Sequence, residues 1–485
     1  MFGLPTEIFG SHLVVKRTKA IIIVRKLPGI LRRRFPQLLD AGKKGFIRRK
    51  RGPNFKGARF YFPYKYDRFL IDMTNSSRAE ESSAVRREVL RNRGIQLLLP
   101  NTIEIAEEVD PERIANGVVI HPGCRLRGRD LSIGSGSILG EEAPVTLENC
   151  QCGRRVHLKG GFFSEATFLD GVSMGLGSHV RPGTLLEEEA SAAQGVGFKQ
   201  TILFPFVTTG SLINFCDCLM AGGTSRKDHS EVGSSYVHFN YTPYGDKATA
   251  SLLGDVPRGV MLDQPPIFLG GQGGLVGPSG IGYGAILPAG IVRRTDVPDG
   301  RAVHFEEPMR VRPPRAFTSG TDRPLGHILQ RNLLYIGNLL ALHAWYQEVR
   351  SRSLTRDSYD CAVLKGGSLR IEQGIQERIR RLDELSQGLD PSRRKPGSEA
   401  SLFLAQWPSL RERLKAVHPS EAGSSALAVF LTAWDSAPGG RDHPERIQSL
   451  SEEARRAGTQ WLQSIVDVTV ALGAELDAGF RAHPA

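Results

Sequence analysis

Residues 196–294 read VGFKQTILFPFVTTGSLINFCDCLMAGGTSRKDHSEVGSSYVHFNYTPYGDKATASLLGDVPRGVMLDQPPIFLGGQGGLVGPSGIGYGAILPAGIVRR. Glycine and proline recur throughout this stretch, and its aliphatic residues stand singly instead of on a helical stripe. Both features disfavour an α-helix. The stretch therefore predicts extended chain interrupted by many turns.

A six-residue period leads into this stretch from upstream. Apolar residues recur at that spacing in short series: Ile114, Ile120 and Leu126; Ile133, Leu139 and Val145; Cys152 and Leu158; Phe163 and Leu169; Val180 and Leu186. Turn-forming sequences such as His121-Pro122-Gly123 separate these series. A hexapeptide repeat of this kind is typical of a β-helix, in which each turn adds aliphatic side chains to a narrow core. We therefore predict a mainly β fold with a parallel β-helix over residues 114–294.

The sequence after the repeat changes character. Residues 295–322 are rich in proline and arginine and form a predicted linker. Beyond them, apolar residues recur three and four apart, at Leu329, Leu333, Ile336 and Leu340 and again at Ile375, Ile379, Leu382 and Leu385. This period predicts helices, and further helices are expected over residues 402–417, 426–434 and 447–480. Residues 323–485 are thus predicted to be an α-helical unit that packs on the β-helix or on a neighbouring subunit.

The N-terminus is strongly basic. Residues 1–60 contain sixteen lysines and arginines but two acids, so this segment accounts for the chain's net charge of +12. We predict a basic, disordered extension over residues 1–65 and a short helical lead-in over residues 66–113. Runs such as Arg48-Arg49-Lys50-Arg51 suit phosphate backbones or anionic lipids, but stacking aromatics are sparse. We therefore do not expect nucleic acid or an anionic surface as a partner.

Length and composition fit an ordinary globular protein. The 485 residues are enough for two or three structural units, with 40% hydrophobic and 24% charged residues. No apolar run reaches the length that spans a bilayer, and the first residues lack the order of a signal peptide. The six cysteines form no disulfide framework. These features predict a cytoplasmic protein without a transmembrane segment.

A family resemblance rests on short landmarks that occur in the family's order: Val180-Arg181-Pro182-Gly183, Val196-Gly197-Phe198-Lys199, Asn240-Tyr241, Lys247, Leu253-Gly254-Asp255 and Leu287-Pro288-Ala289-Gly290. With these, residues 196–292 resemble the acetyltransferase half of the bifunctional UDP-N-acetylglucosamine pyrophosphorylase/glucosamine-1-phosphate N-acetyltransferase. The resemblance implies a left-handed β-helix, acetyl-CoA as cofactor, a sugar phosphate or nucleotide sugar as substrate, and a homotrimer with clefts between adjacent solenoids.

A second resemblance concerns the pyrophosphorylase label. Residues 214–278 are similar to bacterial proteins labelled UDP-N-acetylglucosamine pyrophosphorylase. A pyrophosphorylase needs a nucleotide-binding α/β domain with a glycine-rich loop after its first strand. No such strand, loop and helix pattern precedes the repeats. The pyrophosphorylase domain is therefore expected to be missing from this sequence.

The family's binding residues are matched one at a time. Its sugar-phosphate contacts fall on Arg181, Lys199, Asn214 and Lys247, and its acetyl-CoA contacts fall on Asn240, Tyr241, Gly271 and Ala289. Paired cations suit a phosphate group because each adds a charge-assisted hydrogen bond. The resemblance thus implies an anionic ligand.

The family's catalytic histidine is replaced by Ser211 in this chain. A serine has no basic form near neutral pH and cannot accept the proton of an amine. A neutral imidazole can, so His238 is the predicted base and His229 is the alternative. The competing interpretation is that His238 is a hydrogen-bonded structural residue.

Two further patterns leave alternatives open. Cys216, Cys218 and His229 suggest zinc, but they lack a fourth ligand at a standard spacing, and we expect no metal. The run of residues 270–274, GGQGG, suits either a backbone nest for a pyrophosphate or tight corners that need positive φ angles.

Two functions follow from these residues. The first is a transferase that acts on a hexosamine phosphate or nucleotide sugar, with acetyl-CoA-dependent N-acyl transfer as the favoured reaction. The second is a non-catalytic β-helix that serves as a ligand sensor or assembly scaffold. The replacement of the family's base favours the second, and the retained binding residues favour the first.

Overall fold

The structure is a computed structural model. It describes residues 80–238, 249–305, 325–354, 357–389, 398–417, 422–437 and 442–474, and the backbone of 6–9, 12–17 and 20–24. Two compact units divide the chain, Met1–Glu81 and Ser82–Ala485. In the first unit, strands β1 (Thr6–Phe9), β2 (His12–Arg17) and β3 (Ala20–Val24) form an antiparallel sheet. Branched aliphatic residues in β2 and β3 favour extended chain.

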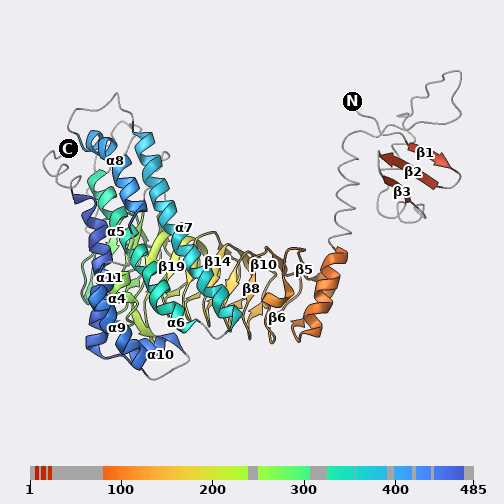
Figure 1. Cartoon of the computed structure of the whole chain (residues 1–485), viewed down its shortest axis with the longest axis horizontal. Coiled ribbons are helices and arrows are strands. Elements are labelled where there is room, and N and C mark those ends of the chain that lie inside the picture. Colours follow the sequence, from red (N-terminus) through yellow and green to blue (C-terminus); the bar gives the residue numbers. More distant parts are fainter. Residues whose placement is uncertain are drawn as a thin grey trace, which may run out of the picture. The chain divides into compact units, whose positions relative to one another are not determined.

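The second unit is built on a parallel β-solenoid (Figure 1). Its strands form three faces, numbered in the order in which the chain reaches them within a turn. The third face is an 11-stranded ladder in the order β4 (Gln96–Leu97), β6 (Val119–Ile120), β9 (Ile138–Leu139), β12 (His157–Leu158), β15 (Ser173–Met174), β18 (Ser191–Ala192), β20 (Thr208–Thr209), β24 (Glu231–Val232), β27 (Phe268–Leu269), β30 (Ala285–Leu287) and β32 (Ala302–Val303). The ladder begins before Ile114, because β4 already pairs with β6.

The first and second faces share two long strands, β19 (Gly197–Leu203) and β21 (Asn214–Met220), which bend from one face to the other. The first face also holds β5 (Glu104–Ile105), β7 (Arg125–Arg127), β10 (Val145–Glu148), β13 (Gly161–Ser164), β16 (Ser178–Val180), β25 (Tyr236–Val237), β28 (Gly274–Leu275) and β31 (Val292–Arg293). The second face holds β8 (Ser132–Ile133), β11 (Gln151–Cys152), β14 (Ala166–Phe168), β17 (Thr184–Leu186), β26 (Ser251–Leu253) and β29 (Gly280–Ile281).

The six-residue period corresponds to one face of the solenoid. Ile133, Leu139 and Val145 lie on β8, β9 and β10, on three different faces, and all three are fully buried. Equivalent residues of successive turns stack in register, as Phe198 does on Phe215. Burying one such side chain contributes roughly 1.5–3 kcal/mol, so the stacked core stabilises every turn. The predicted parallel β-helix with an α-helical C-terminal region is confirmed.

The corner between the first and second faces bends through left-handed backbone. Asn149, Glu165, Gln200 and Asp217 have φ angles of 49°, 46°, 50° and 54°, and Gly183 has 80°. Such angles are uncommon for residues with a side chain, although asparagine and aspartate tolerate them. Repetition of this bend aligns the corner residues along the solenoid.

Two long helices cover the second face. Helix α5 (Leu325–Trp345) contacts β26 and the short helix α4 (Val256–Gly259). It continues through the π-helix η3 (Tyr346–Arg350) and α6 (Ser351–Ser353). Helix α7 (Ser358–Gly388) contacts β8, β11, β14 and β17, and Figure 1 shows it lying along the solenoid. Helix α7 begins earlier than the apolar period at Ile375 indicates, because its first half carries glycine and polar residues against the solenoid.

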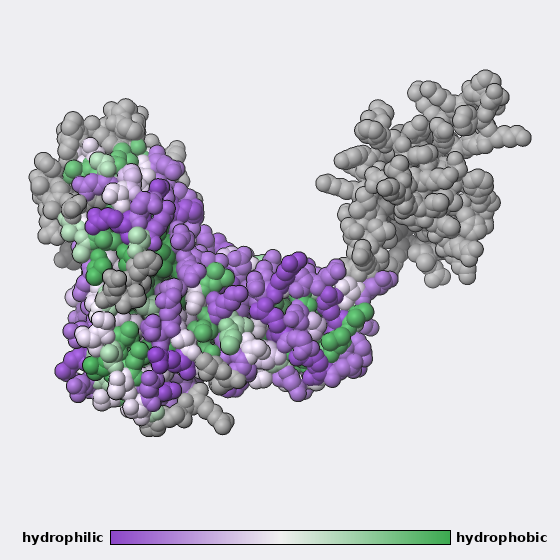
Figure 2. Space-filling view, viewed as in Figure 1, coloured by the Kyte–Doolittle hydropathy of each residue, from purple (hydrophilic) through white to green (hydrophobic). Residues whose placement is uncertain are grey.

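The remaining helices pack around α5. They are α8 (Glu399–Lys415), α9 (Ser424–Ser436), α10 (His443–Gln448) and α11 (Glu452–Ala471). The region predicted as one helix over 447–480 thus contains two, because Ser451 caps the start of α11. Ahead of the solenoid, residues 80–92 are helical. Hydrophilic side chains dominate the face in Figure 2, with smaller hydrophobic patches among them. Among the residues described, no helix is long and apolar enough to cross a membrane.

A buried ionic cluster joins η3 to the solenoid. The Tyr346 hydroxyl donates to Glu187 Oε1 at 2.8 Å, and Arg350 Nη2 donates to Glu188 Oε1 at 2.6 Å. Burial raises the pKa of Glu187 to about 7; Arg350 opposes this shift and Glu188 adds to it. The pKa of Glu188 is also raised by burial, and the charge of Asp170 adds to that shift.

This cluster predicts a pH-dependent stability. An unfolded glutamate titrates near pH 4.5, so between about pH 4.5 and 7 the folded chain holds a proton that the unfolded chain has released. Stability should therefore fall as the pH rises through this window, by on the order of 3 kcal/mol. Glu187→Gln should reduce the fall, because it accepts the Tyr346 hydrogen bond without ionising. Urea unfolding at pH 5 to 8 measures this, with exposed Glu142→Gln as control; equal pH dependence in all three proteins would contradict it.

Candidate anion-binding site

Two predicted cations converge on the first face. Arg181 directly follows β16 and donates its backbone N–H to Phe198 O at 2.9 Å. It therefore lies beside Lys199 of β19, on the next turn of the solenoid. Lys199 pairs in register with Cys216 on β21. The guanidinium of Arg181 extends to Cys216 Sγ, with Nη2 and Sγ 3.6 Å apart. Because adjacent strands lie about 4.8 Å apart, this side chain crosses the turn that carries Lys199.

These two cations lack acidic partners. Within the part of the chain that the structure describes, neither Arg181 nor Lys199 takes part in an ion pair, and both are partly buried. Two fully buried arginines of this unit do have carboxylate partners: Arg350 pairs with Glu188, and Arg378 pairs with Asp217. Two neighbouring cations without an acid repel each other and lose part of their hydration, so an anion between them is strongly favoured.

The polar neighbours of this pair are Cys216 and Asn214. Burial raises the pKa of the Cys216 thiol, and the charge of Asp217 adds to the shift while Arg181 and Lys199 oppose it. The thiol therefore stays protonated at neutral pH and is not a thiolate nucleophile. Asn214 is exposed on the same strand and faces outward with Cys216. Its amide can donate to a ligand held by the two cations.

The predicted cofactor residues lie along another edge of this face. Gly271 and Ala289 occupy equivalent corner positions on successive turns, between the third and first faces, and Gly290 N donates to Gly271 O at 2.9 Å. The corner of Gly271 is three turns beyond Lys199, which corresponds to about 14 Å along the solenoid. Asn240, Tyr241 and Lys247 lie outside the described residues. The structure thus brings together Arg181, Lys199 and Asn214 of the predicted phosphate contacts and, separately, two of the predicted cofactor contacts.

The glycine run forms close-packed corners. A Cβ on Gly270 would lie 2.3 Å from Ala289 N, and one on Gly273 would lie 2.6 Å from Ile291 O, so both positions exclude a side chain. The residue with a positive φ at this corner is Gln272, at 54°, and not a glycine. The run thus forms the expected tight corner, but the positive φ angle falls on Gln272. Gly270 and Gly273 exclude a side chain because the next turn approaches them closely. Gly271 has more room, since its added Cβ would meet only Ser234 N, at 3.5 Å.

His238 closes the first-face strand β25. Its Nε2 lies 2.8 Å from Ser251 Oγ, and Ser251 is fully buried beside Ser279. Its φ angle is 63°, and its Nδ1 is also shielded from solvent. A Cβ on Gly277 would lie 2.2 Å from His238 Nε2, so the imidazole fits closely against this glycine. This geometry gives His238 a structural contact in addition to the catalytic role that the sequence predicts.

The alternative base and the serine lie elsewhere. His229 belongs to the hairpin of β22 (Gly223–Ser225) and β23 (Asp228–His229), which leaves the solenoid between the second and third faces. It is therefore separated from Arg181 and Lys199 by the solenoid. Ser211 lies at the third-to-first corner, in line with Gly271. Within the described ranges, no three His, Cys, Asp or Glu side chains are grouped to hold a metal ion.

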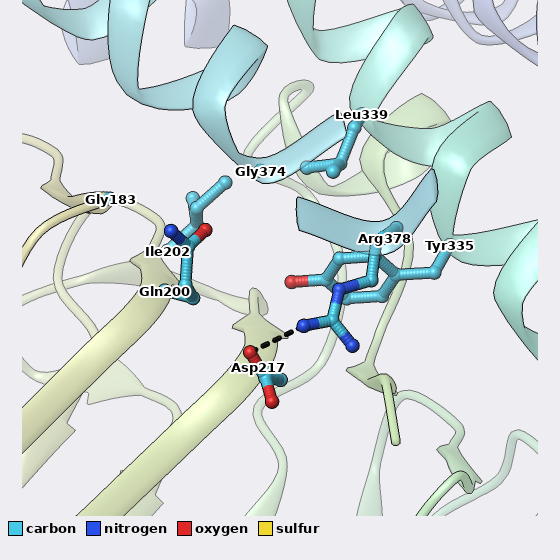
Figure 3. A pocket seen from close by; sticks show the side chains of 8 residues that line it. All are labelled: Gly183, Gln200, Ile202, Asp217, Tyr335, Leu339, Gly374 and Arg378. Atoms are coloured by element: carbon cyan, nitrogen blue, oxygen red, sulfur yellow. Dashed lines mark hydrogen bonds and ion pairs between the residues drawn. The ribbon is translucent and has the colours of Figure 1, made fainter. Parts of the chain in front are cut away.

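Helix α7 adds residues that sequence reasoning did not identify. Arg378 Nη2 donates to Asp217 Oδ1 at 2.6 Å, and Asp217 directly follows Cys216 (Figure 3). Gln200, the residue after Lys199, lines the same seam with Gly374 of α7 and Tyr335 of α5. The partners are 161 residues apart in sequence, and no local pattern links them.

Comparison with known proteins gives relatives named bifunctional protein GlmU. The chain is 31% identical to that of Trichlorobacter lovleyi over 206 residues, which cover 42% of this chain and 40% of the relative. For Pelobacter propionicus the identity is 28% over 234 residues, covering 46% and 45%. For Mycobacterium leprae it is 27% over 235 residues, covering 48% and 43%. The chain thus spans less than half the length of these relatives. These matches confirm the resemblance to the bifunctional enzyme that the sequence landmarks indicate. No protein-family model matches the chain.

The contact between His238 and Ser251 predicts a stability effect. His238→Ala should cost about 1–2 kcal/mol, because it leaves the buried Ser251 hydroxyl without this partner. His238→Asn should retain most of the stability, since asparagine tolerates left-handed backbone and keeps a polar side chain. Urea unfolding measures both. An Ala variant as stable as the unmodified protein would remove the structural role.

Proposed function

We propose that this protein is a transferase of UDP-N-acetylglucosamine synthesis that acts on a hexosamine phosphate or nucleotide sugar. The observation that carries the proposal is the pair Arg181 and Lys199, two partly buried cations without an acidic partner among the described residues. The similarity to proteins named GlmU supports the same assignment. The favoured reaction is N-acyl transfer from acetyl-CoA.

The position of each residue on the solenoid suggests its role in the proposed site. Arg181 and Lys199 hold the phosphate, and Asn214 orients the sugar from the neighbouring turn. Acetyl-CoA supplies an activated acetyl group as a thioester when it is bound. Gly271 suits that ligand, because a Cβ there would meet only Ser234 N, at 3.5 Å, and the equivalent residue of the next turn, Ala289, is small. Asn240, Tyr241 and Lys247 complete the proposed contacts by resemblance.

The proton of the acceptor amine needs a base. Ser211 cannot supply one, and His238 shares its Nε2 with Ser251. His238 serves as base only if its ring leaves that contact when substrate is bound, as catalytic hydrogen bonds often tighten only in the complex. A base contributes roughly a hundredfold to ten-thousandfold to the rate, so His238→Asn with intact stability separates the two roles. Ligand binding without transfer to any hexosamine phosphate would instead support the sensor function.

The phosphate site predicts the effect of Arg181→Ala. The variant should bind glucosamine 1-phosphate or UDP-N-acetylglucosamine more weakly by about 1.5–3 kcal/mol, the range for a hydrogen bond to a charged group. Its stability should change little, because among the described residues the side chain of Arg181 forms only a weak hydrogen bond with Cys216 and no ion pair. Calorimetric titration measures the binding. Arg127→Ala, which removes a cation of the same face that already pairs with Glu104, is the matched control. Equal affinity of both variants and the unmodified protein would refute the site.

Large apolar side chains on the first face and its corner support the proposed homotrimer. Phe162, Leu176, Leu212 and Tyr236 are 37%, 39%, 64% and 48% exposed. Light scattering should give three times the chain mass of 53.2 kDa. Leu212→Asp should lower that mass, because a carboxylate in an apolar contact is costly. A monomer at micromolar concentration would contradict the proposal.

A further inference from the structure

Helix α7 follows the corner between the first and second faces. Arg370 Nη1 lies 3.8 Å from Glu165 Oε2, and further along the helix Arg378 binds Asp217. Both acids belong to the series of left-handed corner residues. Gly374 lies between the two arginines and lines the same pocket as Gln200 (Figure 3). The helical unit therefore borders the turns that carry Arg181, Lys199 and Cys216.

Arg378 is held from two sides. It is 1% exposed and donates to Asp217 Oδ1 at 2.6 Å and to Thr249 O at 2.5 Å. The side chain of Asp217 is 14% exposed. Because Asp217 has left-handed backbone, its carboxylate turns from the first face toward α7, although its neighbour Cys216 faces outward. The pair is thus a fixed contact between the solenoid and the helix.

Asp217 directly follows Cys216, the register partner of Lys199 on the next strand, so it lies within electrostatic reach of Lys199. Burial raises the pKa of Asp217, while the charges of Arg378 and then Lys199 oppose the shift. Lys199 forms no ion pair in the described part of the chain, although its register partner Cys216 is next to Asp217. Glu377 and Arg381 of α7 also act on Asp217, but they are paired with each other, with Arg381 Nε 2.9 Å from Glu377 Oε1. Arg378 is therefore the cation that holds Asp217.

We propose that Arg378 is a positioning residue of the phosphate site, which binds Asp217 and thereby leaves the Lys199 ammonium free for the ligand's phosphate. Without Arg378, the Asp217 carboxylate attracts Lys199 and competes with the ligand. The helical unit thus takes part in ligand binding without touching the ligand. This inference rests on the proposed function, since it assigns a role within the same site.

The test is a double-mutant cycle in the full-length protein. Asp217→Asn, Arg378→Met and the double variant are titrated with glucosamine 1-phosphate. Arg378→Met should weaken binding at least tenfold, because Asp217 then competes for Lys199. Asp217→Asn should not weaken it, and the double variant should return to within about threefold of the unmodified protein. A purely structural role predicts instead that the double variant binds as weakly as Arg378→Met, and that result would overturn the proposal. So would a tenfold loss with Asp217→Asn.

A second readout needs no ligand. The amine of Lys199 is followed by NMR after reductive methylation with ¹³C-formaldehyde, and Lys199→Gln assigns its signal. Arg378→Met should shift that signal at neutral pH, because Asp217 then approaches the amine, and the double variant should reverse the change. An unchanged signal would refute the proposal. If the unmodified protein binds no sugar phosphate, the proposed function fails while this readout still tests Arg378.

Folding is checked for every variant by urea unfolding. Arg378→Met leaves a buried carboxylate without its partner, which is strongly destabilising. If that variant does not fold, Arg378→Gln replaces it, because an amide still donates to Thr249 O but carries no charge. The double variant removes both buried charges and is expected to fold.

Discussion

The parallel register between successive turns determines where every side chain of the candidate site lies. Phe198 stacks on Phe215, and this fixed step places Lys199 beside Cys216 on the outer side of the same two strands. A slip of one residue would turn the core side chains outward and scatter the cations, because side chains alternate between the two sides of a strand. The core that stabilises the solenoid therefore also aligns the residues of the proposed ligand site.

The helical unit is joined to this frame through buried charges as well as apolar contacts. Arg350, Arg370 and Arg378 are 1%, 2% and 1% exposed, and each meets polar or acidic groups of the solenoid. Buried ion pairs add little net stability, because desolvation offsets most of their attraction, but a missing partner is costly. The three pairs thus favour one placement of the helices on the second face over others of similar apolar area.

The sequence predicts what depends on local repetition. The six-residue period identifies the solenoid, since each face takes one repeat, and the eighteen residues from Arg181 to Lys199 correspond to one turn. It cannot predict contacts between distant segments, such as Arg378 with Asp217 or His238 with Ser251. It also misjudges Gln272, because a left-handed corner there is imposed by the neighbouring turns and not by the residue's own preference. The first half of helix α7 is also missed, because the polar and glycine residues that pack against the solenoid form no apolar period within the helix.

The proposed phosphate-binding residues, Arg181 and Lys199, lie next to the corner that helix α7 covers, and this position has an electrostatic consequence. On the covered side, Arg350, Arg370 and Arg378 each donate to a polar or acidic side chain of the solenoid. On the open side, Arg181 and Lys199 keep their charge available to solvent and ligand. Asp217 lies at the corner between these two sides, and the direction of its carboxylate determines whether it pairs with Arg378 or with Lys199. Because its backbone is left-handed, the carboxylate is directed to α7, and the two cations of the first face remain unmatched within the described chain. The left-handed backbone of one solenoid residue thereby separates a structural ion pair from the proposed anion site.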